Sequence, residues 1–389
     1  MGFLNFNSNK KPQGETVVTT SQDFLSQIAV GDRDLSKPFI DDHYVHNNGM
    51  VYFGHDNLYP NLLNNLYLSS SIHSTCVNFK TNTIIGGGWS WKDYDSLSGQ
   101  HKMDLKSWVA KHKFNDLIEQ IAKDWVKHNR VYILLKFKEG KVVKSKLVDP
   151  ANVRNDSRGI FKDVERYFIS DDFSRGITRK EVKPYHMTCK DEWQMLELTG
   201  KTGGSMTYSL PDYIAAGNWL YLDGEVSYLY KQGIVNSINP SMIFKFPFET
   251  TPEVKSKIRN MLTKSGKGAK NMGRVFTFFK EKEQQPEIET VKTTNNDKLY
   301  SQTSSEIKDN IAIAHQLDPS MIGVKVAGKL GNSQELRIQY EVFEKNWVIK
   351  NRRIIQEFVN KFAQITEAHG KIEINRFSII DDDTLSTQK

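Results

Sequence analysis

The sequence predicts an α+β protein, in which helical and strand patterns occupy separate stretches of the chain. Helical spacing near residues 57–85 and 103–128 gives way to an alternating run that turns at Glu139-Gly140. A short β-α-β pattern at 241–280 then lies between two helical patterns, and a further long helical pattern begins at Ser333. Strands that appear in runs, separate from the helices, favour α+β over an alternating α/β fold.

The first two hundred residues predict a mixed body of helices and strands. Residues 1–20 are rich in Asn, Lys, Thr and Gly, which is typical of a flexible N-terminal arm, and the body extends over 21–209. Within it, the first helical pattern breaks near Ser69 to Ser71 and stops at three glycines, 86–88. A helical pair over 103–128 places Trp108, Phe114, Leu117, Ile121 and Trp125 on one face, and a hairpin at 131–150 with strands near 164–170 and 193–199 follows.

Residues 210–240 predict a helix that carries Pro211 in its first turn and ends at Asn239-Pro240. Its apolar residues recur as one stripe, formed by Trp219, Leu222, Val226, Leu229 and Ile234. The next segment, 241–290, holds the β run MIFKFPFE, a helix at about 252–263, the basic turn KSGKGAKNMGR and the β run VFTFF. Helical pattern resumes over 291–322.

A loop at 323–333, GVKVAGKLGNS, separates that helix from the last long one. It carries three glycines, two lysines and no acidic residue, together with Val324, Val326 and Leu330. Residues 334–380 predict a helix of about 50 Å, at 1.5 Å per residue, and a strand, before an acidic tail at 381–389. We expect the helix to bury its apolar stripe between subunits, and the stripe consists of Leu336, Tyr340, Phe343, Trp347, Ile354, Phe358 and Phe362.

Composition limits the class of protein without fixing its function. The chain has 389 residues, a formal net charge of +7 and a mean hydropathy of −0.54. This charge permits contact with phosphates but does not require it. Two cysteines, Cys76 and Cys189, form no CxxC pair, so the sequence predicts neither a disulfide framework nor a cysteine zinc site. Without a long apolar stretch or a signal-peptide core, we expect a soluble intracellular protein with no membrane contact.

The sequence contains no convincing active site. The turn at 264–274 lacks the Ser or Thr that must follow Gly-Lys in a phosphate-binding loop. His43, His46 and His55 are ordinary loop residues more often than metal ligands, and the carboxylates Asp171-Asp172 and Asp381 to Asp383 lack a separated third ligand for a two-metal nuclease. Most tryptophans and tyrosines lie on apolar stripes, which favours core packing over base stacking. We therefore expect no catalysis, no cofactor and no metal, and a structural or conduit role.

The order of the elements resembles the portal proteins of tailed bacteriophages over about residues 57–366. YPNLL…TNTIIGGGW is similar to the early helices of the family's wing, and VYILLKFKEGKVVKSKLVDPANVR to its wing hairpin with a "DP..VR" turn. INPSMIFKF…GKGAKNMGRVFTFF resembles the clip. IAIAHQLDPSMIGV and GNSQELRIQYEVFEKNWVIKNRRIIQEFVN resemble the segments before and after the tunnel loop. Lys350 stands where many relatives carry Pro, so we expect a straighter helix here.

The resemblance implies a fold of wing, stem helices, clip, tunnel loop and long wing helix, with the crown reduced or absent. In the family's terms the wing is 21–209, the stem helices are 210–240 and 291–322, the clip is 241–290 and the tunnel loop is 323–333. The loop would place Lys325, Lys329 and Asn332 near DNA phosphates in a central channel. The clip would present its basic turn, Lys264, Lys267, Lys270 and Arg274, to the packaging motor.

The same resemblance implies a homo-oligomeric ring, of twelve copies as in the family, at the capsid vertex of the virion. Double-stranded DNA would pass through it, and its partners would be the terminase large subunit, the major capsid protein and head-completion or tail adaptors. Before assembly the protein would lie in the host cytoplasm. Two alternatives stay open from sequence: another head–tail connector ring, such as an adaptor, and a metal-dependent DNA-processing enzyme that uses the Asp clusters.

Overall fold

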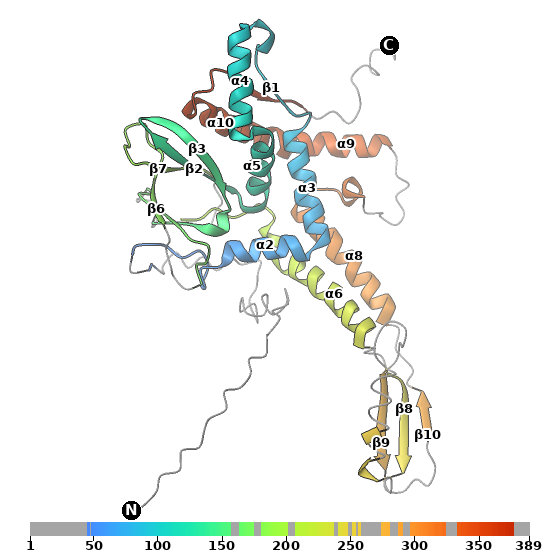
Figure 1. Cartoon of the computed structure of the whole chain (residues 1–389). Helices are drawn as coiled ribbons and strands as arrows, with labels where there is room; N and C mark the ends of the chain where they lie inside the picture. Colours follow the sequence, from blue (N-terminus) through green and yellow to red (C-terminus); the bar gives the residue numbers. More distant parts are fainter. Residues whose placement is uncertain are drawn as a thin grey trace, which may run out of the picture. The chain divides into compact units, whose positions relative to one another are not determined.

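A computed structural model describes most of the chain (Figure 1). The described residues are 45–46, 48–156, 163–174, 180–200, 207–236, 240–247, 251–253, 256–257, 274–280, 287–290, 296–323 and 333–376. The predicted N-terminal arm at 1–20 and acidic tail at 381–389 lie outside these ranges. Within them, no helix combines the length and the hydrophobicity that a membrane crossing requires. The mixture of helices and sheets confirms the predicted α+β class.

The first helical pattern forms two helices, α2 (Tyr59–Ser69) and α3 (Ser71–Ile85), and breaks where the sequence predicts. Ser70 has an extended backbone, and its hydroxyl oxygen accepts a hydrogen bond from the amide of His73. This side chain satisfies one of the amides that every helix N-terminus leaves unpaired. Gly86, with φ of 61°, ends α3 in a region that favours glycine.

The second helical pattern also forms a pair, α4 (Gly99–His112) and α5 (Phe114–His128), joined at Lys113 in the left-handed region. α5 contacts α3 and strand β2, and so lies at the centre of the body. Its buried face consists of Phe114, Leu117, Ile118, Ile121, Ala122, Trp125 and Val126. Burial of each large side chain on this face contributes about 1.5–3 kcal/mol.

A six-stranded sheet packs against α5. Its strands run in the order β3-β2-β7-β6-β5-β4, and every neighbouring pair is antiparallel except β6 with β7. The predicted hairpin of β2 and β3 turns at Glu139 and Gly140, both with positive φ. Sequence spacing missed β4 and β6, since runs of three to five residues are too short to show alternation. The bounds are β2 Arg130–Lys138, β3 Lys141–Val148, β4 Val153–Asn155, β5 Tyr167–Ile169, β6 Lys180–Pro184 and β7 Trp193–Thr199.

A two-stranded sheet joins the two ends of the body. Strand β1 (Trp89–Trp91) pairs with β11 (Ile372–Ile374), so the predicted C-terminal strand has a partner far away in sequence. Around it, the Trp108 ring lies 5.5 Å from Trp91 and 5.0 Å from Phe114 between centroids. The Trp108 indole also donates to the hydroxyl of Thr366, at 2.9 Å. This aromatic cluster fixes α4 and α5 to the chain that follows the last helix.

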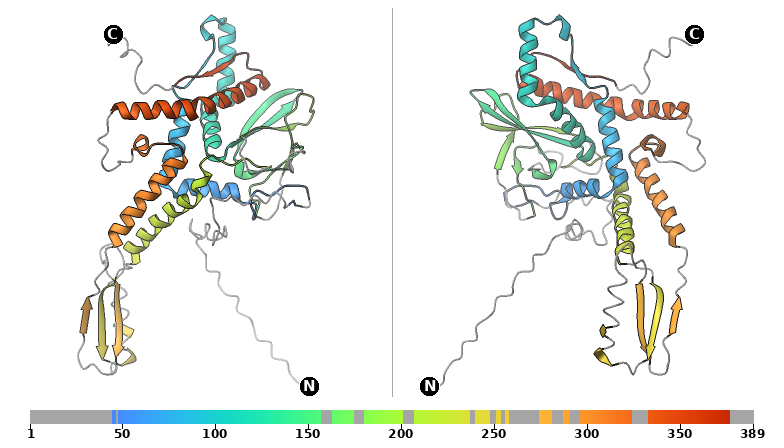
Figure 2. Two further views of the ribbon diagram at one scale, coloured as in Figure 1. Left: turned by 180° about the vertical axis from the view of Figure 1, so that it is seen from behind. Right: turned by 45° about the vertical axis from the view of Figure 1, so that its right-hand side comes forward.

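The helices predicted within 210–240 and 291–322 both form, and they contact each other (Figure 2). Helix α6 (Gly217–Asn236) follows a 3-10 turn, η3 (Ile214–Ala216), so Pro211 precedes the helix and does not lie in its first turn. Proline at 211 fixes φ in the approach to that turn, which explains the misplaced boundary. Helix α8 (Asn296–Ala314) leads to a second 3-10 turn, η4 (Pro319–Ile322). Along α6, Leu222 and Leu229 are exposed in this chain.

Between the stem helices in sequence, the chain forms a three-stranded sheet in the order β10-β8-β9. The parallel pairing of β8 (Pro240–Pro247) with β9 (Arg274–Lys280) is what a β-α-β unit predicts. The helix expected at 252–263 falls mostly outside the described residues. Sequence analysis missed β10 (Glu287–Thr290), which pairs antiparallel with β8. With β10, the sheet has three strands from one chain, and a sheet of three strands is more stable than an isolated pair.

The last helix contains a π turn that the spacing did not predict. Helix α9 (Ser333–Phe343) passes through a π turn, η5 (Glu344–Val348), into α10 (Ile349–Ile365). A π turn inserts the equivalent of one residue, which moves the buried face on by one position. Ile355 is therefore fully buried where Ile354 was expected. The expectation of a regular rod fails at this turn.

Candidate functional site

The described residues on both sides of 324–332 belong to one junction of helices. Helix α8 and η4 precede that segment and α9 follows it, and all three contact neighbours in α3 or η4. Three polar networks hold the junction together. Because η4 ends at Ile322 and α9 begins at Ser333, the junction positions the described residues on each side of 324–332.

The first network surrounds the ammonium group of Lys80, whose side chain is 0% exposed. Its Nζ lies 3.0 Å from Oδ2 of Asp212, just before α6, and 4.3 Å from the ring centroid of Trp347 in the π turn. The Trp347 indole donates to the same carboxylate oxygen, at 2.6 Å. Burial lowers the pKa of Lys80, and the Asp212 carboxylate opposes that shift. One carboxylate thus joins α3, the start of α6 and the last helix.

The second network is a pair of buried histidines. Nδ1 of His73 in α3 and Nε2 of His315 at the end of α8 lie 2.9 Å apart, so one ring donates to the other. The Tyr213 ring stacks on His315, with centroids 4.8 Å apart, and lies tilted against His73, with centroids 4.5 Å apart. Burial, reinforced by the charges of Lys80 and Lys127, lowers the pKa of His73 to about 3, and burial also lowers that of His315 well below its ordinary value. Both rings are neutral at pH 7.

The third network lies at the π turn. Glu344 is buried, and its carboxylate accepts from the Arg376 guanidinium at 2.7 and 2.9 Å. Arg352 lies 3.8 Å from the same carboxylate and donates to the carbonyl oxygens of Thr83 and Ile84 at the end of α3. Those carbonyls have no partner within their own helix, so the guanidinium completes the C-terminus of α3.

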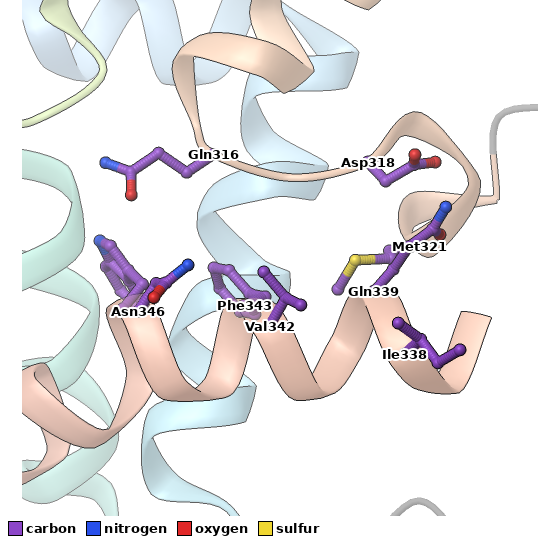
Figure 3. Close-up of a pocket in the computed structure, with 9 residues that line it drawn as sticks. Gln316, Asp318, Met321, Ile338, Gln339, Val342, Phe343 and Asn346 are labelled. Carbon is purple, nitrogen blue, oxygen red and sulfur yellow. The ribbon is translucent and has the colours of Figure 1, made fainter. Parts of the chain in front are cut away.

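A small pocket lies between η4 and α9 (Figure 3). Gln316, Asp318 and Met321 line it from the η4 side, and Ile338 and Val342 line it from α9. Its volume is about 260 Å³. The Ser320 hydroxyl bridges its two walls, since it bonds to Asp318 and donates to Gln339 Oε1 at 3.0 Å. Gly323 follows in the left-handed region, with φ of 81°, and so turns the chain out of η4.

Most residues that the sequence singled out for contact with DNA or the motor lie outside the described residues. These are Lys325, Lys329 and Asn332 of the loop and Lys264, Lys267 and Lys270 of the basic turn. Arg274 is described, and it begins strand β9 opposite Pro240. It is therefore a strand residue and not part of the turn.

The structure corrects the predicted subunit interface. Five residues of the stripe are each at most 6% exposed in the single chain: Tyr340, Phe343, Trp347, Phe358 and Phe362. The prediction that the stripe is buried between subunits is wrong for these five, because contacts within the chain already cover them, as the 6.0 Å contact between the rings of Phe79 and Phe343 illustrates. Ile354 is half-buried and Leu336 is 36% exposed, so those two stay predictions.

The candidate metal ligands are not brought together. Among the described residues, no group of three His, Cys, Asp or Glu side chains could hold a metal ion. His46 bonds to Asn48, His55 is exposed, and Asp172 caps the turn at Ser174. His43 and Asp381 to Asp383 lie outside the described residues. Sequence reasoning missed Lys80, Asp212, His73 and His315, because a lone polar residue on an apolar helix face gives no sign of its partner.

Comparison with solved structures identifies the fold. No protein-family model and no curated protein matches the sequence. A chain of the structure "Virion of native gene transfer agent (GTA) particle" aligns with a TM-score of 0.56 at 13% identity, over 86% of each chain. A chain of "Neck of native GTA particle computed with C12 symmetry" gives 0.52 at 14% identity, over 83% of this chain and 85% of that one. An HK97-family phage portal protein from Corynebacterium diphtheriae aligns more loosely, at 0.43 and 11% over 79% and 94%. The fold therefore rests on the two gene transfer agent chains.

We predict that acid weakens the junction through its histidine pair. The folded-state pKa of His73, about 3, lies below the ordinary value of about 6.5, so the unfolded chain binds more protons between these pH values. Stability is full above pH 6.5 and falls as pH drops toward 3, by up to about 1.4 kcal/mol per pH unit for each histidine. His315→Gln should reduce by about half the pH dependence of the free energy of unfolding that the histidine pair contributes. Urea unfolding at pH values from 7 to 5 measures it.

The control for this experiment is His369→Gln, which alters an exposed histidine. Other buried histidines, His112 and His128, also have lowered pKa values and contribute equally in every variant. The informative quantity is therefore the difference in slope between the two substitutions. Equal slopes for His315→Gln, His369→Gln and the parent chain would contradict the assignment.

A second prediction concerns the buried ammonium. Asp212→Asn leaves Lys80 without its carboxylate, and breaking a buried ion pair costs about 3–5 kcal/mol. Because Asp212 is itself 33% exposed, we expect about 2–3 kcal/mol lost from the free energy of unfolding. Glu373→Gln breaks the exposed pair with Lys92, at 3.8 Å, and should cost at most about 0.5 kcal/mol. Similar losses in the two variants would show that the Lys80 pair is not a structural centre.

Proposed function

We propose that this chain is the portal protein of a tailed phage or phage-like particle, and that its ring conducts double-stranded DNA. The observation that carries the proposal is the basic loop 323–333, which follows η4 and precedes α9 at a junction of fixed geometry. The shared fold with chains of a virion and its neck supports the same role. A conduit requires weak, sequence-independent contact with phosphates, which lysines on a glycine-rich loop provide.

We infer that twelve copies assemble, because a compared neck was computed with C12 symmetry. Large apolar side chains are exposed on the helices that flank the junction. They are Leu222, Leu229 and Tyr230 of α6, and Ile338, Val342 and Ile349 of α9 and α10. Ile338 and Val342 are four residues apart in α9 and so lie on one face of that helix, whereas Ile349 follows the π turn at the start of α10. A second copy that covers these two faces would bury them, and each large side chain would contribute about 1.5–3 kcal/mol.

In this ring, Lys325, Lys329 and Asn332 would lie nearest to the DNA phosphates. The sheet of β8, β9 and β10, with the basic turn Lys264, Lys267 and Lys270, would meet the acidic surface of the terminase large subunit. The body formed by 45–209 would contact the major capsid protein, and head-completion or tail adaptors would bind after packaging. Lysine contacts of this kind are screened by salt, so they suit a channel through which DNA must slide.

Ring formation provides the first test. Ile338→Glu together with Val342→Glu should leave a folded monomer or small oligomer, because both side chains are more than half exposed in the single chain. Light scattering gives the mass, and negative-stain images show rings or their absence. Met103→Glu, which alters a 65% exposed residue of α4, is the matched control and should form normal rings. Intact rings from the double variant would remove this face from the interface.

The loop provides the second test. Lys325→Ala with Lys329→Ala should leave ring assembly intact and reduce packaged or retained DNA, with the largest difference at low ionic strength. For DNA bound to purified rings, loss of two phosphate contacts should lower the salt slope by about 2 for each loop in contact. Lys350→Ala with Lys361→Ala, on the exposed side of α10, is the charge-matched control.

Deletion of 326–330 separates a working loop from a simple connector. A connector tolerates shortening, whereas a loop that reaches DNA does not. We expect intact rings that package poorly or leak DNA. Normal yields of filled, stable heads from both the lysine variant and the deletion would overturn the assignment of this loop as the DNA contact, while the ring test would still stand by itself.

A further inference from the structure

A cluster of lysines occupies the face of the six-stranded sheet that points away from α4 and α5. On the covered face, Ser145 bonds to His112 of α4. On the other face, the strand register places Lys136 opposite both Lys144 and Trp193, and Lys146 opposite Leu134. Lys180 of β6 joins them, because its ammonium group lies 3.6 Å from the centroid of the Trp193 ring. We call Lys136, Lys144, Lys146, Lys180 and Trp193 the lysine face. These residues come from β3, β2, β7 and β6, which are neighbours in the sheet (Figure 1).

The charge of the lysine face is poorly balanced within the chain. Its four ammonium groups face one nearby carboxylate, Glu192, which lies 3.0 Å from Lys136. Lys144 and Lys146 are exposed and have no ion-pair partner among the described residues. Lys136 also lies 5.3 Å from the Trp193 ring that Lys180 covers, so two cations share one aromatic side chain. Like charges directly opposite each other in a sheet are destabilising, so the chain retains an unfavourable arrangement here.

Protection of a sheet edge explains only part of this arrangement. β3 is an edge strand, and lysines on an edge prevent pairing with other chains. However, Lys136 is on β2 and Lys180 is on β6, which are interior strands with a neighbour on each side. A charge on an interior strand protects no edge. Protection against strand pairing with other chains therefore does not explain the lysines on β2 and β6.

The floor of the face is apolar. Leu134, Ile169 and Trp193 are partly buried and pack on the core cluster that includes Tyr132 and Met195. An aromatic and aliphatic centre with a charged rim is the arrangement found at protein interfaces. We propose that the lysine face binds an acidic segment of a partner protein, with carboxylates on the four lysines and an apolar side chain on the partly buried Leu134 and Ile169.

Two observations favour an acidic protein segment over nucleic acid. Trp193 already carries two ammonium groups, so its ring is not free to stack on bases as it would in a single-strand binding site. The patch crosses four adjacent strands, a width of about 14 Å at 4.8 Å per strand, which is short for a duplex-binding stripe. A compact patch with an apolar centre suits a few acidic residues around one hydrophobic anchor.

The test uses the purified full-length chain and three labelled probes: a glutamate oligomer, a glutamate oligomer of equal length with interspersed leucines, and a double-stranded DNA oligonucleotide. Fluorescence anisotropy should give the tightest binding for the probe that contains leucine. Lys144→Glu with Lys146→Glu should weaken it at least about tenfold, equivalent to about 1.4 kcal/mol, because two attractive charge contacts are replaced by two repulsive ones. Added salt should reduce the difference between the parent and the variant.

The charge-matched control is Lys350→Glu with Lys361→Glu, which should change binding less than twofold. The Tm of Lys144→Glu should equal or exceed that of the parent, since glutamate opposite Lys136 replaces repulsion with attraction. Lys144→Gln with Lys146→Gln repeats the test without new negative charge. DNA bound more tightly than either glutamate probe, no binding of any probe, or equal losses in the lysine-face and control variants would overturn the proposal.

Discussion

A single buried charge constrains the centre of this protein. The ammonium group of Lys80 has no access to water, so it must find its partners within the chain or lose its proton. Its partners are Asp212, which lies 132 residues further along the sequence, and Trp347, which lies another 135 residues beyond Asp212. Because a buried cation must keep its partners, these contacts hold α3, the start of α6 and the last helix together.

The elements that flank the loop at 323–333 are held in place in the same way. The histidine pair fixes the end of α8 to α3, and the Ser320–Gln339 hydrogen bond fixes η4 to α9. A loop whose two ends are held at fixed positions loses less entropy on contact with a ligand than one on mobile supports. Glycine at 323 provides the turn out of η4. In the function proposed above, DNA would therefore pass a segment whose two flanking elements are held in place by packing within the chain.

The sequence predicted elements where periodicity was long and end signals were strong. The Ser70 cap, the stop at Gly86 and the turn at Glu139-Gly140 are local effects, and each formed where expected. Short strands such as β6 and β10 pair with strands elsewhere in the chain, and they are too short to show an alternating pattern in the sequence. The π turn at 344–348 depends on Glu344 meeting Arg352 and Arg376, which no local pattern encodes. The same holds for the site: a basic loop can be read from its composition, whereas the network that positions it exists only after folding.

In the last helix, the apolar side chains that pack within the chain are different from those that stay exposed. Tyr340, Phe343 and Trp347 face inward and hold the chain together, whereas Ile338 and Val342 of the same helix stay exposed. A substitution on the inner face would unfold the chain before it could report on assembly. A substitution on the outer face changes only what a second copy would touch. Because the two faces lie on one rigid helix, the geometry of the junction determines the direction in which the outer face points, and the fold thereby sets the angle between neighbouring copies in the proposed ring.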